Sequence, residues 1–195
     1  MEENALIQNC EMLIFGGSAG SLEVLVQILP RLKPVRKFAI VIVLHRKSAE
    51  DTTLENLIAM KTDIPVAKIE DKEFLKPGTI FIAPSDYHLL FEKTGHIALD
   101  VSEKVHYSRP SIDVTFESAA IAFGSKCTAI LLSGANADGT EGLKLIAKVG
   151  GTVIVQDPST AVMPFMPESA IAALTPNYIL NIHEIINFVN ASEIN

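Results

Sequence analysis

Three polar side chains of the types needed for acyl transfer each follow an apolar run of the chain: Ser18, His45 and Asp138. A serine hydroxyl becomes a strong nucleophile only when an imidazole takes its proton. A carboxylate on the other ring nitrogen fixes the tautomer of that imidazole and stabilises its protonated form. The three residues supply these groups once each. They predict a hydrolase that works through a covalent acyl-enzyme, provided that the fold brings them together.

The serine lies in a glycine-rich turn between an expected strand and an expected helix. Gly16, Gly17 and Gly20 permit a sharp turn after the apolar run 12–15, and a helical pattern begins at Ser21. The spelling Gly16-x-Ser18-x-Gly20 fits the nucleophile elbow G-x-S-x-G. By itself the stretch is equally well explained as a structural Gly/Ser turn. A phosphate-binding turn is the weaker alternative, because neither a Gly-Lys-Ser/Thr ending nor the spacing G-x-G-x-x-G is present.

The other two candidates also have structural alternatives. His45 could be an ordinary loop histidine, and Asp138 could simply cap the helix that starts near Thr140. His106 is the one rival base, because its loop could fold over the edge of the sheet. The chain order Ser, His, Asp differs from the order Ser, acid, His of the α/β-hydrolases, which argues against that family.

The elements that must position these residues alternate between strands and helices. Strands are predicted at 12–15, 38–44, 66–69, 78–84, 127–132 and 152–155; helices are predicted from 21 and over 53–60, 112–123 (capped by Ser111), 140–149, 170–172 and 182–189. A Thr-Gly turn between the extended stretches 88–92 and 96–100 predicts a β-hairpin at one edge of the sheet. The fold class is therefore α/β, a doubly wound three-layer α/β/α sandwich with a mostly parallel sheet. Ligands bind at the carboxyl ends of the strands in such folds, where all three candidates lie.

Length, charge and cysteine content narrow the class of protein. A chain of 195 residues fits one domain, residues 1–195. The net charge of -7 and the lack of a Lys/Arg cluster argue against nucleic acid as a partner. Cys10 and Cys127 have no metal-ligand spacing and are expected to be free thiols. Acidic residues at the amino terminus and the lack of a long apolar run predict no signal peptide and no membrane insertion, and thus a cytoplasmic protein.

Five blocks of sequence, in the right order, carry a family resemblance. They are 15–20 (FGGSAG), 43–45 (VLH), 109–114 (RPSIDV), 133–139 (SGANADG) and 156–158 (QDP) leading to 166–171 (MPESAI). With these blocks the chain resembles the catalytic domain of the chemotaxis protein-glutamate methylesterases, the CheB family. The resemblance implies a serine hydrolase without a cofactor or a metal, with Ser18 as nucleophile, His45 as base and Asp138 as acid.

The same resemblance implies a substrate and partners. The expected substrate is a glutamate γ-methyl ester on the cytoplasmic helices of a methylated chemoreceptor, from which methanol is released during chemotaxis adaptation. Some members of the family also deamidate receptor glutamines. Two alternatives stay open: a non-catalytic receptor-binding or nucleotide-binding module that has kept the fold, and an esterase with a non-chemotactic substrate.

The chain departs from the family pattern in two places. The family usually has Gly-Met-Gly where this chain has Gly134-Ala135-Asn136. Many members also carry an amino-terminal receiver domain that controls activity by phosphorelay. Here the catalytic motif begins almost at once, which leaves two alternatives: a stand-alone catalytic domain served by a separate receiver or signalling protein, or a fragment of a longer protein. The residues expected to line the substrate site are Ala19, Arg109, Ala135, Asn136, Met166 and Pro167.

Overall fold

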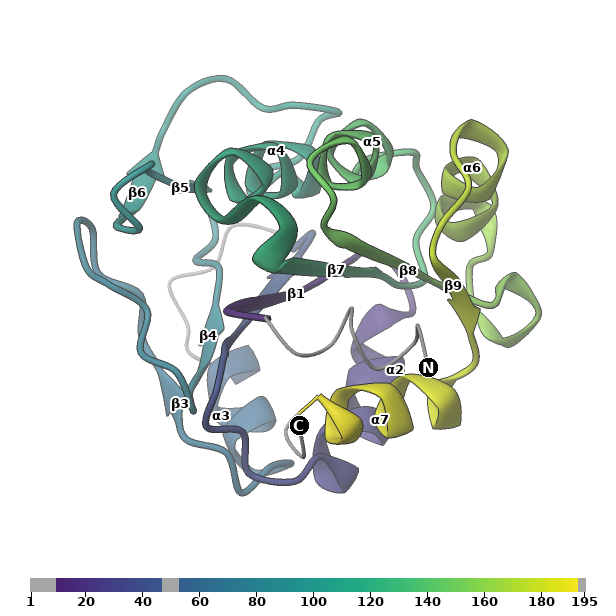
Figure 1. The fold of residues 1–195 in the computed structure, drawn as a ribbon, viewed down its shortest axis with the longest axis horizontal. Coiled ribbons are helices and arrows are strands. Elements are labelled where there is room, and N and C mark those ends of the chain that lie inside the picture. Colours follow the sequence, from purple (N-terminus) through teal and green to yellow (C-terminus); the bar gives the residue numbers. More distant parts are fainter. Residues whose placement is uncertain (1–9, 47–52, 193–195) are drawn as a thin grey trace.

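A seven-stranded parallel sheet forms the middle layer of the molecule, with strand order β3-β4-β2-β1-β7-β8-β9 (Figure 1). This computed structural model describes residues 10–46 and 53–192. The first residues, on which part of the signal-peptide expectation rests, lie outside the described residues. The strands are β1 (Met12–Gly17), β2 (Ala39–Leu44), β3 (Val66–Ala67), β4 (Ile80–Ile82), β5 (His88–Phe91), β6 (Ile97–Asp100), β7 (Cys127–Leu131), β8 (Thr152–Gln156) and β9 (Tyr178–Leu180).

Helices cover both faces of this sheet. Helices α4, α5 and α6 lie on one face, and α2, α3 and α7 lie on the other (Figure 1). The bounds are α2 (Ser21–Ile28), α3 (Thr53–Ala59), α4 (Ile112–Phe123), α5 (Thr140–Lys148), α6 (Phe165–Ala173) and α7 (Ile182–Ala191), with short 3-10 helices at Leu29–Arg31, Gly124–Lys126 and Pro158–Thr160. The three-layer α/β/α sandwich predicted from the sequence is therefore confirmed.

Two hydrophobic cores explain why the central strands are apolar without interruption. Side chains alternate along a strand, so one set packs under α2, α3 and α7 and the other under α4, α5 and α6. In β1, Leu13 and Phe15 belong to the first core, and Met12 and Ile14 belong to the second. Each of these four side chains is at most 2% exposed. The central strands are thus held from both sides, which fixes the positions of the loops that follow them.

Two parts of the fold differ in detail from the expectation. The predicted hairpin, β5 and β6, forms a separate two-stranded antiparallel sheet and packs against α4. The edge strand β9 was not predicted, because it has only three residues and closely follows Pro176. Cys10 and Cys127 are both buried and free, as expected. Within the described residues, no helix is long and apolar enough to cross a membrane.

Strand order places the candidate residues at one edge of the sheet. The central strand β1 pairs with β2 on one side and β7 on the other, and all three run in the same direction. Gly17 pairs with Leu44, and Gly16 pairs with Leu131. The loops after β1, β2 and β7 therefore leave the sheet next to one another, although they are far apart in sequence.

Candidate active site

Backbone contacts hold the turn that carries Ser18. The Ser18 N–H donates to the carbonyl oxygen of Ser133, with N and O 2.9 Å apart. Its own carbonyl accepts from the N–H of Ser21 at 3.0 Å and from the Ser21 hydroxyl. A Cβ on Gly17 would lie 2.6 Å from the Ser21 side chain, and Gly20 has φ +82° at the start of α2. These glycines let the chain turn sharply and leave Ser18 half-exposed above the sheet.

The backbone also brings His45 next to this turn. The His45 N–H donates to the carbonyl oxygen of Gly17 at 3.1 Å, so the hydrogen bonding between β1 and β2 continues one residue past the end of β2. Ser18 follows Gly17 directly. The serine turn consequently lies between the loop of His45 on one side and the loop after β7, which contains Ser133, on the other.

The structure brings His45 and Asp138 into direct contact. Nε2 of His45 and Oδ2 of Asp138 are 2.7 Å apart, and their side chains are 9% and 0% exposed. This short, buried contact orients the imidazole, and the carboxylate favours a proton on Nε2. Asp138 therefore does more than cap a helix, which was its structural alternative.

The carboxylate of Asp138 is held from several further directions. Oδ1 accepts from the Ser111 hydroxyl and from the N–H groups of Asp113 and Gly139, at 3.0 to 3.1 Å. Oδ2 also accepts from the N–H of Ile112 at 2.8 Å. Burial alone raises the pKa of this carboxyl, but the hydrogen bonds from His45 and from the backbone of Asp113 and Ile112 outweigh burial and hold the pKa at about 2. Asp138 thus stays ionised, and it caps α4 rather than the helix α5 that follows it.

The second ring nitrogen of His45 faces Asn136. Nδ1 of His45 lies 3.4 Å from Nδ2 of Asn136, and Oδ1 of the same amide accepts from the Asp138 N–H at 3.2 Å. The Ser18 hydroxyl has no hydrogen-bond partner among the residues that the structure describes. The geometry therefore joins the predicted base to the predicted acid and places the serine turn beside them, without a hydrogen bond between Ser18 and His45.

A second Ser/His/Asp grouping, which the sequence did not reveal, shares the Asp138 carboxylate. Its other members are Ser111 and His88, and all three residues are buried. The Ser111 hydroxyl donates to Asp138, while the ring nitrogens of His88 face the Ser111 N–H at 3.1 Å and the carbonyl oxygen of Glu103 at 2.9 Å. Because both ring nitrogens face backbone groups, His88 is placed to hold the loop before α4 instead of taking a proton from a hydroxyl.

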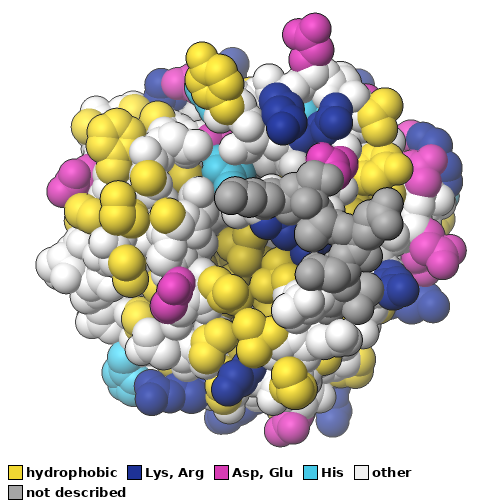
Figure 2. Space-filling view, turned by 180° about the vertical axis from the view of Figure 1, so that it is seen from behind, with side chains coloured by type: hydrophobic (Ala, Val, Ile, Leu, Met, Phe, Trp, Pro, Cys, Tyr) yellow, Lys and Arg dark blue, Asp and Glu magenta, His cyan; other side chains and the backbone are white. Residues whose placement is uncertain are grey.

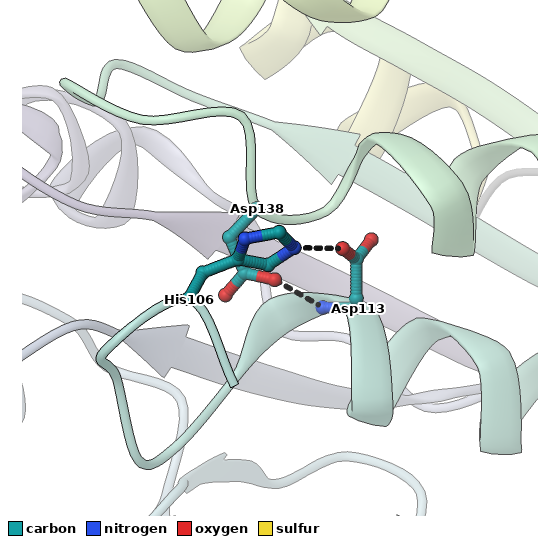
Figure 3. Close-up of side chains that lie close together, drawn as sticks. All are labelled: His106, Asp113 and Asp138. Atoms are coloured by element: carbon teal, nitrogen blue, oxygen red, sulfur yellow. Dashed lines mark hydrogen bonds and ion pairs between the residues drawn. The ribbon is translucent and has the colours of Figure 1, made fainter. Parts of the chain in front are cut away.

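His106, the rival base, lies against another carboxylate (Figure 3). Its Nε2 is 3.5 Å from Oδ2 of Asp113, and its side chain is 52% exposed. Ligating atoms of His106, Asp113 and Asp138 all lie within 4.8 Å of one another. Both Asp138 oxygens already accept hydrogen bonds from the protein, so we assign no metal site to this cluster.

This fold and this arrangement agree with one known family. The family model for the CheB methylesterases matches residues 13–189. The chain belongs to the CheB methylesterase family. A crystal structure of the CheB methylesterase catalytic domain from Thermotoga maritima matches with a TM-score of 0.87 at 33% sequence identity, covering 93% of this chain and 97% of that one. The resemblance inferred from the five sequence blocks is thereby confirmed.

Curated relatives are named as protein-glutamate methylesterases and protein-glutamine glutaminases. A candidate protein-glutamate methylesterase/protein-glutamine glutaminase of Leptospira interrogans is 40% identical over 91% of this chain and 92% of its own length. The protein-glutamate methylesterase/protein-glutamine glutaminase of Thermotoga maritima is 34% identical over 90% of this chain, which spans 52% of that relative. The chain is thus an enzyme of the protein-glutamate methylesterase family.

The residues expected to line the substrate site divide into two groups. Ala19 and Ala135 are exposed beside the Ser18 turn, and Asn136 and Arg109 are half-buried. Met166 is fully buried, and Pro167 is buried beside it in α6, so neither offers a side chain to a substrate. Met166 instead packs against Gly134, where an added Cβ would lie 2.5 Å from its Cε. The apolar side chains exposed near this place, at 39 to 61%, are Val162, Met163 and Phe165.

Proposed function

We propose that the protein hydrolyses glutamate γ-methyl esters on the cytoplasmic helices of a chemoreceptor, with Ser18 as nucleophile, His45 as base and Asp138 as acid. The observation that carries this assignment is the buried contact of 2.7 Å between His45 and Asp138 beside the Ser18 turn. Membership of the family and the names of the relatives support the type of reaction. The receptor, the role in chemotaxis adaptation and the cytoplasmic location are parts of the same proposal.

In the proposed reaction the Ser18 hydroxyl attacks the ester carbonyl while Nδ1 of His45 takes its proton. Nδ1 is the basic nitrogen because Asp138 holds the proton on Nε2. In this structure, without substrate, the amide of Asn136 faces Nδ1 at 3.4 Å. This is a long hydrogen bond, and the Ser18 hydroxyl replaces it when substrate is bound. The imidazolium then gives this proton to the departing methoxide oxygen, which leaves as methanol. Water, activated by His45, finally hydrolyses the acyl-enzyme to glutamate.

Backbone N–H groups are proposed to stabilise the oxyanion of the tetrahedral intermediate. The Ser18 N–H is committed to the Ser133 carbonyl. The N–H groups of Ala19 and Ala135 have no acceptor among the described residues, and both residues are exposed beside the serine. An oxyanion donor needs no side chain, so the replacement of the family's methionine by Ala135 leaves this role intact.

Deamidation of glutamine is the second candidate activity, because the relatives are named for both reactions. It uses the same acyl-enzyme, with ammonia as the leaving group in place of methanol. We further propose that residues 1–195 form a single catalytic domain, which the family match over residues 13–189 supports.

The choice between the two serines can be tested directly. We expect a fluorophosphonate probe to label Ser18 and not the buried Ser111, as read by peptide mass spectrometry. Ser18→Ala should lower methanol release from methylated receptor at least about 10³-fold, because the nucleophile is lost. Ser111→Ala keeps the nucleophile and removes one hydrogen bond to Asp138, so it should retain labelling. Probe attached to Ser111, or undiminished methanol release by Ser18→Ala, would overturn the assignment.

A further inference from the structure

A pocket of about 380 Å³ opens directly at His45. Three cationic side chains line it together with one carboxylate and an aromatic ring: Arg46, Lys104, Arg109, Asp86 and Tyr107. The chain as a whole has a net charge of -7, so this local excess of positive charge is unlike the rest of the molecule. In Figure 2, Lys and Arg side chains (dark blue) stand beside histidine side chains (cyan) in the upper part of the face shown.

The cationic groups of this pocket are only partly neutralised. Arg46 pairs with Glu55, with Nη2 and Oε1 2.8 Å apart, and Arg109 uses Nη1 on the carbonyl oxygens of Val101 and Ser102. The Nε atoms of both arginines are buried and have no hydrogen-bond partner among the described residues. Lys104 is exposed, and it forms no ion pair with any residue that the structure describes. The exposed Lys104 ammonium is therefore the donor that an anion entering the pocket can reach, next to the two arginines.

The wall of the pocket next to Lys104 is a tight turn at residues 105–108. Val105 and Ser108 pair through two backbone hydrogen bonds of 3.2 and 2.8 Å, and the two residues between them both have positive φ, as in a type I′ turn. This conformation is costly for non-glycine residues, and it presents Tyr107 with 97% of its surface exposed. The turn thus places an aromatic ring and a cation at the rim of the pocket.

We propose that this pocket binds a carboxylate of the substrate protein, from an acidic residue within one helical turn of the ester that Ser18 attacks. The proposal rests on the proposed function and adds a specificity site to it. Because His45 itself lines the pocket, an ester at Ser18 and a group in the pocket are neighbours. Side chains four residues apart on a helix have their Cβ atoms about 5–6 Å apart, so one helix can offer both groups. Tyr107 would then contact the same helix.

The test compares two labelled helical peptides by fluorescence anisotropy. Each carries one glutamate γ-methyl ester; four residues further on, one peptide has Glu and the other has Gln. Binding is measured to the Ser18→Ala protein, in which the ester is not consumed. We expect the Glu peptide to bind about five- to tenfold more tightly at low salt, and this ratio to fall toward one as salt screens the charges.

Charge reversal at the rim tests the assignment to this pocket. Lys104→Glu in the Ser18→Ala protein should bring the affinity ratio below one. The matched control is Lys148→Glu, an equal charge change on an exposed lysine at the end of α5, which should leave the ratio as it was. Each ratio compares two ligands on one protein, so a partly unfolded preparation does not alter it. A ratio of one before the change, the same ratio after Lys104→Glu, or no measurable binding of the Glu peptide would overturn the proposal. A preserved ratio without methanol release by the protein with Ser18 would support the pocket and overturn the methylesterase assignment.

Discussion

Asp138 and Asp113 lie side by side, yet their surroundings push the two carboxyl groups in opposite directions (Figure 3). Asp138 accepts from His45, from a hydroxyl and from backbone N–H groups, which hold its pKa at about 2 despite burial. Asp113 is also buried, and among the described residues its one backbone donor is the N–H of Gly142, at 2.8 Å. Burial is the largest effect and raises its pKa. The hydrogen bond from Gly142 opposes burial, and the neighbouring Asp138 adds to the increase, so that the pKa of Asp113 is about 6.

This difference shows how the fold keeps one carboxylate ready for chemistry. Asp138 precedes α5 and receives the first N–H groups of α4, whereas Asp113 belongs to α4 and receives an N–H of α5. The two helix starts therefore cap each other, and the glycine at position 142 lets them approach. An added Cβ there would lie 2.4 Å from Cβ of Phe116. Most of the donors point at Asp138, so the negative charge is concentrated on the residue that touches His45.

The largest expected contrast is in activity. Asp138→Asn should lower kcat/KM for ester hydrolysis by about 10³- to 10⁴-fold, because an amide no longer fixes the tautomer of His45. Asp113→Asn should lower it less than about fivefold, since this residue does not touch His45. Steady-state methanol release by both variants measures the contrast, with circular dichroism as the check on folding. Equal losses in the two variants would mean that the pair acts as one unit.

A smaller contrast is expected in stability. Asp138→Ala leaves the Ser111 hydroxyl and several buried N–H groups unpaired, so it should lower the free energy of unfolding by about 3 kcal/mol. Asp113→Ala removes one acceptor from the start of α5 and should cost about 1 kcal/mol. Urea unfolding at about pH 7 gives both values, with the exposed Glu141→Ala in α5 as the matched control. A greater loss for Asp113→Ala would reverse the ranking of the two carboxylates.

The sequence was sufficient to predict the three-layer architecture, though not the edge strand β9 or the separate sheet of β5 and β6, because the central strands follow a simple rule. Buried parallel strands are uninterrupted apolar runs, and their carboxyl ends share one edge, so the meeting of His45 and Asp138 could be predicted from two such runs. Ser111 was correctly predicted as the cap of α4, where its oxygen accepts from the Val114 N–H at 3.4 Å. The role of Ser18 and the cleavage chemistry stay predictions until the variants are measured.

The remaining features depend on side-chain packing across distant segments. That Asp138 caps α4, and not the helix after it, follows from the approach of two helices separated by the whole of β7. The pairing of His45 Nδ1 with the Asn136 amide depends on a ring orientation that has no sequence signal. Met166 was expected at the substrate, but its side chain is buried in α6 and packs on Gly134, which is distant in sequence. Local sequence does not reveal such a contact.

The pH dependence of stability offers the finest separation of the two aspartates. The pKa of Asp113 is about 6 in the folded chain, whereas the ordinary value, which applies to the unfolded chain, is about 3.9. The contribution of Asp113 to the free energy of unfolding therefore falls as the pH rises from about 4 through about 6. Asp138 has the opposite sign: its contribution is lost as the pH falls from about 4 toward about 2. Urea unfolding at several pH values between about 4 and 7 should therefore show Asp113→Asn gaining stability relative to the unmodified protein as the pH rises. A difference that stays constant over this range would show that Asp113 is ionised throughout, and that His106 and Gly142 outweigh its burial and the charge of Asp138.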